Sequence, residues 1–109
     1  MKKKEKNKVT LNGSQKRYLR GLGHHLEQTV IIGREGLSET LVQATGDVLK
    51  ARELIKVKLG QNCPLDKKEA ADRLAGQTDS CLVQLIGKTI LLYRPNQDLA
   101  KEQRIRLPR

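Results

Sequence analysis

Residues 29–59 read T-V-I-I-G-R-E-G-L-S-E-T-L-V-Q-A-T-G-D-V-L-K-A-R-E-L-I-K-V-K-L. The first four of these residues, 29–32, form a short β-branched and apolar run, which predicts a buried strand. Residues 54–59 alternate between apolar side chains and the lysines Lys56 and Lys58, which predicts a strand with one buried face. The segment between the two strands has helical spacing of its apolar residues. Two strands joined through a helix are typical of a parallel pair with a crossover connection.

Three helices are expected in the chain. Ser14 is predicted to cap the first, which ends near residue 23 or continues to His25. Ser38 is predicted to cap the second, over residues 39–52, and Asp66 begins the third with a capping box. The positions expected on the buried sides are Tyr18, Leu19, Leu22 and Leu26 in the first helix, Leu41, Ala44, Val48 and Leu49 in the second, and Ala71, Leu74 and Ala75 in the third.

The remaining strands are expected at residues 81–86 and 89–94, joined by Gly87-Lys88 in a type II′ hairpin turn. The full order is then helix, strand, helix, strand, helix, strand, strand. This order predicts an α/β fold, a two-layer sandwich in which three helices pack on a four-stranded mixed sheet. A length of 109 residues with 37% apolar residues suits one small domain.

The basic charge of the chain is unevenly distributed. The sequence has 22 Lys and Arg against 12 Asp and Glu, a formal net charge of +10, yet residues 21–93 hold nine residues of each sign. We expect a disordered basic arm at residues 1–9, one domain at 10–96 and a basic tail at 97–109. Basic ends of this kind either bind nucleic-acid phosphates or act as solvated, solubilising tails.

The loop Gly33-Arg34-Glu35-Gly36 interrupts the pattern between the first strand and the second helix. Its two glycines permit positive φ and a close backbone approach, and a helix N-terminus follows directly. A phosphate oxygen fits such a place, with Arg34 supplying charge and Glu35 opposing it unless it pairs or turns away. Two glycines at a strand–helix turn are also ordinary turn chemistry. The loop is neither a P-loop nor a dinucleotide-binding turn, because the residues that those motifs require are absent.

Six further basic residues are candidate contacts for nucleic acid: Lys16, Arg17, Arg20, Lys56, Lys58 and Lys88. The first three lie mainly off the apolar stripe of the first helix, and the last lies in the hairpin. The two strand lysines either line a basic sheet face or are ordinary solvent-facing residues. The chain has no Phe and no Trp, which argues against base-stacking modules and favours contact with backbone and shape.

Catalytic, metal and membrane sites are not predicted. His24 and His25 are neighbours on a helix and point about 100° apart, so they do not chelate one metal. Cys63 and Cys81 are far apart in sequence, with no C-x-x-C pair. No nucleophile with a base and no carboxylate pair can be argued from spacing. Apolar runs of three or four residues are far short of the about 20 needed for a membrane span. We therefore expect a non-enzyme with no cofactor and no metal.

Four separated blocks resemble a known family. They are L-R-G-L-G-H-H-L (19–26), V-I-I-G-R-E-G-L-S-E (30–39), E-L-I-K-V-K (53–58) and V-Q-L-I-G-K-T-I-L-L-Y-R-P (83–95). In this order they resemble the CRM domain (chloroplast RNA splicing and ribosome maturation domain), in particular its bacterial stand-alone, YhbY-like form. The resemblance covers about residues 10–96. It implies an RNA-binding domain similar to the C-terminal domain of translation initiation factor 3, with a G-x-x-G loop, here Gly33 to Gly36, that contacts RNA.

The resemblance also implies a biological setting. Stand-alone bacterial members are associated with precursors of the large ribosomal subunit, and related domains in plant organelles act in intron splicing. We therefore expect a cytoplasmic, monomeric, non-enzymatic assembly factor that binds ribosomal RNA in large-subunit precursors, with no membrane partner. Two alternatives stay open: a general RNA chaperone or intron-binding factor, and a protein–protein adaptor that docks on a ribosomal protein.

Overall fold

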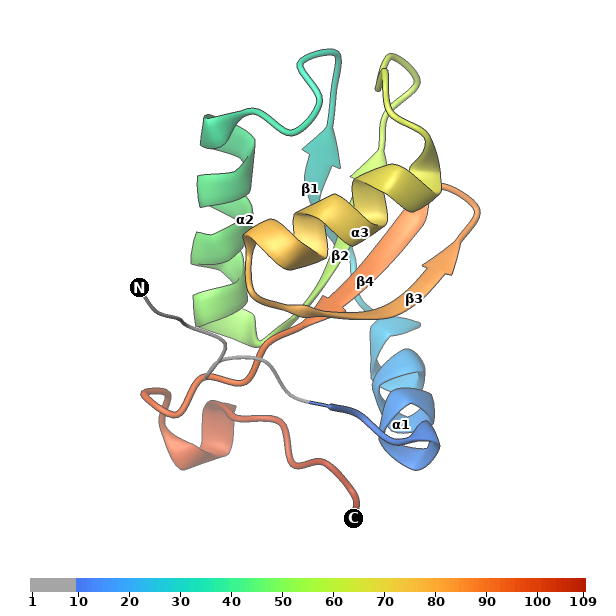
Figure 1. Cartoon of the computed structure of the whole chain (residues 1–109). Helices are drawn as coiled ribbons and strands as arrows, with labels where there is room; N and C mark the ends of the chain where they lie inside the picture. The colour runs from blue at the N-terminus through green and yellow to red at the C-terminus, as the bar shows by residue number, and fades with distance from the viewer. Residues whose placement is uncertain (1–9) are drawn as a thin grey trace.

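The computed structural model describes residues 10–109, so the basic arm predicted at residues 1–9 lies outside the described residues. The described chain contains three helices and four strands in the predicted order (Figure 1). They are α1 (Gly13–Gly23), β1 (Gln28–Ile32), α2 (Glu39–Arg52), β2 (Leu54–Leu59), α3 (Lys67–Gln77), β3 (Cys81–Ile86) and β4 (Thr89–Tyr93). One further turn of 3-10 helix, Lys101–Gln103, follows near the C-terminus.

The four strands form one mixed sheet in the order β1-β2-β4-β3. β1 and β2 are parallel, as the strand–helix–strand unit predicts, and β4 is antiparallel to both of its neighbours. The hairpin between β3 and β4 turns at Gly87, where φ is 57°, while Lys88 does not have a positive φ. This combination fits the predicted type II′ turn, since a type I′ turn needs positive φ at both positions. The α/β fold with a four-stranded mixed sheet is thus confirmed.

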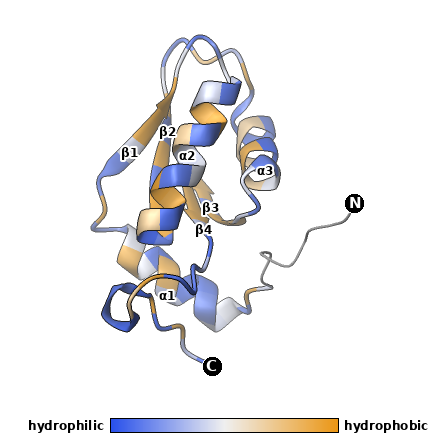
Figure 2. Cartoon of the chain, turned by 90° about the vertical axis from the view of Figure 1, so that its left-hand side faces the viewer, coloured by the Kyte–Doolittle hydropathy of each residue, from blue (hydrophilic) through white to orange (hydrophobic). Residues whose placement is uncertain are grey.

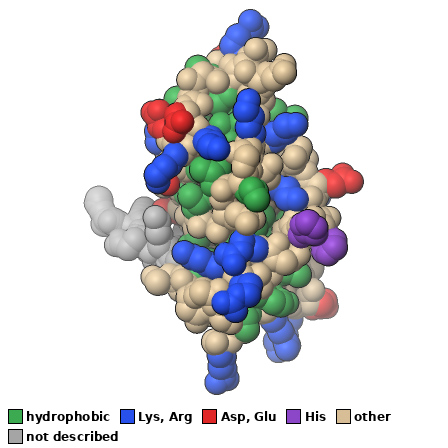
Figure 3. All heavy atoms as spheres, turned by 90° about the vertical axis from the view of Figure 1, so that its right-hand side faces the viewer, with side chains coloured by type: hydrophobic (Ala, Val, Ile, Leu, Met, Phe, Trp, Pro, Cys, Tyr) green, Lys and Arg blue, Asp and Glu red, His purple; other side chains and the backbone are tan. Residues whose placement is uncertain are grey.

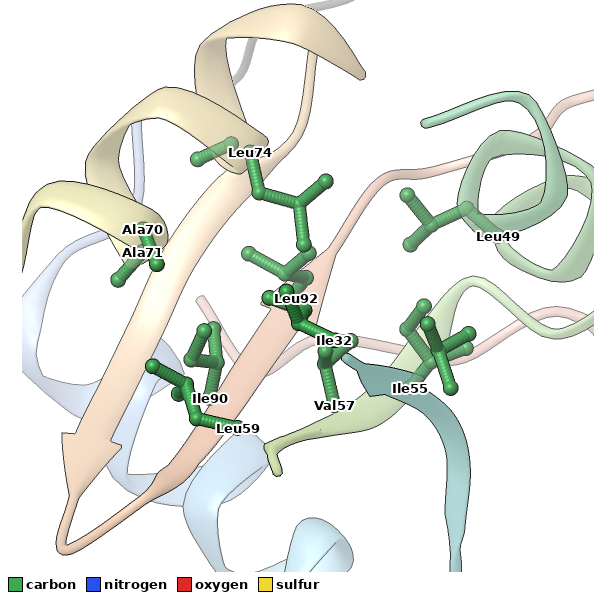
Figure 4. Packing of buried hydrophobic residues seen from close by; sticks show 12 residues of the cluster. Ile32, Leu49, Ile55, Val57, Leu59, Ala70, Ala71, Leu74, Ile90 and Leu92 are labelled. Atoms are coloured by element: carbon green, nitrogen blue, oxygen red, sulfur yellow. The ribbon is translucent and has the colours of Figure 1, made fainter. Parts of the chain in front are cut away.

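The main core lies between one face of the sheet and the helices α2 and α3 (Figure 4). Alternate residues of the strands face these helices, and three of the four buried residues of α3 are alanines, which allows α3 to pack close to the sheet. The buried members of this core are Val30, Ile32, Leu49, Ile55, Val57, Leu59, Ala70, Ala71, Leu74, Ala75, Ile90 and Leu92. All of them are aliphatic, as a chain without Phe and Trp requires.

The opposite face of the sheet carries a second, smaller core under α1 and the C-terminal segment. Its buried residues are Leu19, Leu54, Val83, Leu91 and Tyr93, with Leu11, Leu26, Ile105 and Leu107 packed against them. Figure 2 shows α1 below the sheet, away from the layer formed by α2 and α3. The helices therefore divide between the two faces of the sheet, with α2 and α3 on one and α1 at one end of the other.

Three local predictions about the helices are wrong. Tyr18 and Leu22, expected on the buried side of α1, are 42% and 37% exposed. α1 is capped by Asn12 and not by Ser14: the Asn12 side chain accepts a hydrogen bond from the Gln15 backbone N–H at 2.8 Å, and the Gln15 side chain accepts one from the Asn12 N–H at 3.1 Å. In α2, Ala44 is exposed and Thr45 is buried. The Thr45 hydroxyl is satisfied there because it donates to the Leu41 carbonyl at 2.8 Å.

The C-terminal segment is held against the domain by a buried carboxylate. Glu53 follows α2 with a φ of 66° and is fully buried. Its carboxylate accepts hydrogen bonds from the backbone N–H groups of Asn96 and Ile105, both at 2.6 Å, and from Arg104 Nε at 3.4 Å. Burial raises the pKa of the nearby Tyr93 to about 12, and the negative charge of Glu53 adds to the rise.

Candidate nucleic-acid interface

The loop between β1 and α2 is a closed turn with an exposed tip. The Gly36 N–H donates to the Gly33 carbonyl at 3.0 Å, and Gly36 has a φ of 66°, in the region that favours glycine. Arg34 and Glu35 lie at the tip and are exposed. In the part of the chain that the structure describes, these two side chains form no ion pair with each other. The Arg34 guanidinium is therefore available to an outside partner.

The loop rests on its neighbour, the segment between β2 and α3. The Gly60 N–H donates to the Ile32 carbonyl at 2.9 Å, just before the loop. A Cβ built on Gly36 would lie 3.6 Å from Pro64 Cγ, so the two segments are in contact. Figure 1 shows both of them at the top of the view. These contacts fix the loop relative to the sheet.

The loop on its own is not strongly basic. A groove of about 390 Å³ lies between β1 and α2, and all four residues of the Gly33–Gly36 loop line it together with residues of those two elements. Two carboxylates, Glu35 in the loop and Glu39 in the first turn of α2, oppose the charge of Arg34 and the positive end of the helix. Any strong attraction for an anion must therefore come from basic groups around the loop.

Those basic groups lie at the same end of the sheet. β1 and β2 are parallel and end together, and β4 begins at that edge, because Lys58 pairs with Thr89 and the Leu59 N–H donates to the Lys88 carbonyl at 2.8 Å. We call this end of the sheet, with the Gly33–Gly36 loop, Lys58 and Lys88, the loop end of the sheet. Lys58 and Lys88 are both exposed there.

The sheet face opposite α2 and α3 continues from this edge toward α1. One row across the four strands is formed by Ile31, Lys58, Thr89 and Ile86, which are register partners in turn. Ile31 and Ile86 are 61% and 62% exposed, so this part of the face is open. Lys56 follows on the same face, about 7 Å further along β2, at the two-residue spacing of a strand. The prediction that Lys56 and Lys58 share one side is confirmed.

A second groove, of about 470 Å³, lies where α1 crosses this face. We call it the α1 groove. Arg17 and Arg20 line it from the helix and Lys56 from the sheet, where the Lys56 ammonium donates to the Leu26 carbonyl at 3.0 Å. Figure 3, which views the β3 side of the molecule, shows Lys and Arg side chains spread over this side, with the few visible acidic side chains toward its margins.

The predicted site residues thus fall into two groups, which Lys58 and Lys56 connect along the α1 face of β2. The first is the loop end of the sheet, and the second is the α1 groove, which brings together Arg17, Arg20 and Lys56. Lys16 is exposed on α1 and does not line the α1 groove. Sequence reasoning did not select Gln84 and Thr89, which line the α1 groove, and set aside His24, which also lines it. For His24 a signal existed, since it follows Arg17 and Arg20 by seven and four residues and so shares their helix side.

Within residues 10–109, no group of three or more His, Cys, Asp or Glu side chains is placed to hold a metal ion. None of the helices described has the length and apolar character of a membrane span.

Comparison with known proteins agrees with the resemblance seen in the sequence. The family model for the CRS1 / YhbY (CRM) domain matches residues 11–94. The probable RNA-binding protein YqeI of Bacillus subtilis is 41% identical over 98 residues, which is 90% of this chain and 99% of that protein. An RNA-binding protein of Haemophilus influenzae is 37% identical over 93% of this chain and 98% of its own length. The solution structure of the hypothetical protein SAV1595 from Staphylococcus aureus superposes with a TM-score of 0.74 at 43% identity, covering 91% of this chain and 100% of that one.

Proposed function

The chain belongs to the CRS1/YhbY (CRM) domain family, and on this premise we propose that it is an RNA-binding protein. The observation that carries the proposal is the placement of the basic groups. The loop with Arg34 shares one sheet edge with Lys58 and Lys88, and Lys56 leads from there to the α1 groove. The names of the relatives, which are 37% and 41% identical, support the same conclusion.

The proposed contacts are mainly with the RNA backbone. Lysine and arginine neutralise phosphates and release the counterions that surround them, which favours binding at low salt. Gly33 and Gly36 allow the backbone of the loop to come close to a phosphate, and Arg34 adds a charge at the tip. Since Glu35 and Glu39 oppose this charge, most of the attraction is assigned to the basic face, with Lys16, Arg17 and Arg20 of α1 contributing.

We further propose that the RNA is ribosomal RNA and that the protein is a non-enzymatic factor for assembly of the large subunit. Support comes from the family resemblance, in which stand-alone bacterial members are associated with precursors of that subunit. Backbone and shape recognition also suits a structured RNA, because double-stranded regions present phosphates and 2′-hydroxyls more than base edges. We expect the protein to act in the cytoplasm as a monomer.

The loop contact is tested with Arg34→Ala, and Arg52→Ala serves as the matched control. Both arginines are exposed, but Arg52 lies in the last turn of α2, at the far end of that helix from the loop. Arg34→Ala should weaken binding to a ribosomal RNA fragment and lower the slope of log affinity against log salt by about one. Arg52→Ala should leave the slope unchanged. Equal behaviour of the two variants would contradict the loop contact.

The target is tested by sedimentation of a cell lysate at about 50 and about 200 mM salt, a range over which 6–10 phosphate contacts lose roughly 10³–10⁵-fold in affinity. The protein should sediment with large-subunit precursors at both salt concentrations. A signal spread over all RNA would favour a general RNA chaperone or intron-binding factor. Association that survives nuclease treatment would favour an adaptor on a ribosomal protein.

A further inference from the structure

The α1 groove contains groups that backbone binding leaves unexplained. We propose that it takes a single unpaired nucleotide of the bound RNA and contacts the base as well as the phosphate. The inference rests on the RNA binding proposed above and adds a site that reads base edges. The groove volume of about 470 Å³ lies within the range of sites that hold small organic ligands, about 300–1,000 Å³.

The first argument concerns Gly21, which lies in the last turn of α1. Glycine within a helix is unfavourable compared with alanine, because glycine loses more backbone freedom when the chain folds. Packing within the chain does not require it: a Cβ built on Gly21 meets no atom within 4 Å, and Gly21 does not have a positive φ. Gly21 lies on the helix side of Arg17 and His24 and lines the groove. A ligand that approaches the helix backbone closely would explain the glycine.

The second argument concerns two polar side chains on the sheet side of the groove. Gln84 and Thr89 line the α1 groove and are both partly buried. Among the described residues, neither the Gln84 amide nor the Thr89 hydroxyl has a hydrogen-bond partner. Partly buried amides and hydroxyls usually find partners. Here they face a groove, where they can donate to and accept from the edge of a base.

The third argument is charge and stacking. Arg17, Arg20 and Lys56 border the groove, and no Asp or Glu is among its lining residues, so it suits a phosphate. The His24 ring and the arginine guanidinium groups are planar, and unpaired bases stack on such planes. The apolar floor, with Ile86, suits the face of a base. Cations, planar groups and free hydrogen-bonding groups together match a nucleotide better than a phosphate alone.

The nucleotide is assigned as unpaired because the side chains in the groove must reach the edge of its base. In a duplex the pairing edges of the bases are occupied, and the deep major groove of A-form RNA is closed to side chains. Gln84 and Thr89 can therefore reach the pairing edge of a base only where the strand is single, as in a loop, a bulge or an end.

The test is Gly21→Ala, with Gly46→Ala as the matched control. Gly46 is also within a helix, α2, also lacks a positive φ, and a Cβ there also meets nothing within 4 Å, but it does not line the groove. Both variants should raise the melting temperature by a few degrees. Gly21→Ala alone should weaken binding to a single-stranded oligoribonucleotide by about five- to one-hundred-fold, the effect of one methyl group in a filled contact. Binding to a duplex of the same sequence should change little.

The outcomes separate the two proposals. If Gly21→Ala binds the single strand as tightly as Gly46→Ala does, or if it loses single-strand and duplex binding equally, the nucleotide site is overturned while RNA binding stands. If the unchanged protein binds neither RNA, the proposed function itself fails.

Discussion

At the scale of single residues, Glu53 joins two parts of the fold that are far apart in sequence. It is a fully buried carboxylate, which is costly unless the charge is matched by hydrogen-bond donors. Its donors all come from the C-terminal segment, more than forty residues later in the sequence. Its own carbonyl also accepts from the Arg94 N–H at 2.8 Å, so Glu53 joins the end of α2 to the chain that leaves β4.

Glu53→Gln should therefore lower the free energy of unfolding by about 1–3 kcal/mol. The variant keeps the shape but turns one acceptor oxygen into a donor that faces a backbone N–H. Glu27→Gln, at an exposed position before β1, should change it by less than about 0.5 kcal/mol. Denaturant unfolding followed by circular dichroism measures both. Equal stability of the two variants would show that the acceptor at Glu53 is not needed.

Residue patterns predicted some of these roles but not others. The N-cap at Asn12 was assigned two residues too late, because Ser14 is also a good capping residue and Gly13 between them gives no preference. Glu53 gave no signal at all, since a glutamate at the end of a helix is normally a surface residue. Its burial depends on distant backbone N–H groups, which sequence periodicity does not report.

At the scale of secondary-structure elements, the packing of α1 depends on how close the helix comes to the sheet. Gly23 is buried at its C-terminal end, and a Cβ there would lie 2.7 Å from Leu91 Cδ1 and Cδ2. Gly21, two residues earlier, has open space at the same position. The two glycines thus have different roles. Gly23 allows α1 to pack close to the sheet, whereas Gly21 is attributed to ligand access in the α1 groove.

Gly23→Ala should consequently lower the free energy of unfolding by about 1–3 kcal/mol through overpacking against Leu91. Gly46→Ala, in the open part of α2, should raise it by about 0.5–1 kcal/mol. Thermal unfolding of both variants gives the signs. A stabilising effect of Gly23→Ala would mean that Leu91 moves aside without cost and that α1 is not held at this distance.

The existence and order of the elements could be predicted because each has a clear period and its own end signals. The directions of the side chains in β3 could not be predicted. Its register shifts between Leu82 and Gln84, and this bulge places both Val83 and Gln84 on the α1 face of the sheet. Simple alternation puts neighbouring residues on opposite faces. For this reason Gln84 was not among the candidate site residues, although it lines the α1 groove.

At the scale of the whole molecule, the basic groups come from separate parts of the chain and are brought near one another only by the strand order. β2 is central, so its lysines lie between the loop after β1 and the hairpin before β4. Sequence alone could select Lys56 and Lys58 as candidates, since these lysines alternate with apolar positions. It could not show that Arg17 and Arg20 meet Lys56, because the face of the sheet that α1 covers depends on packing between distant elements.

Removal of residues 1–9 tests how much the basic charge outside the domain contributes to RNA affinity. This segment contains five lysines and one glutamate. If the arm contacts RNA, its removal should weaken binding and lower the slope of log affinity against log salt by up to about four. Affinity measured at several salt concentrations gives the slope, and an unchanged melting temperature shows that the domain stays folded. An unchanged slope would assign the arm a solubilising role.

The C-terminal segment has one further consequence, for the lifetime of the protein in a cell. The Arg104 guanidinium and two backbone N–H groups stabilise the buried negative charge of the Glu53 carboxylate. A protease that trims the chain just upstream of Arg104 would remove Arg104 and the Ile105 N–H, and would leave the buried carboxylate with fewer donors. Such a clipped chain should unfold more often and be degraded faster, so intact and clipped forms would differ in half-life before they differ in binding.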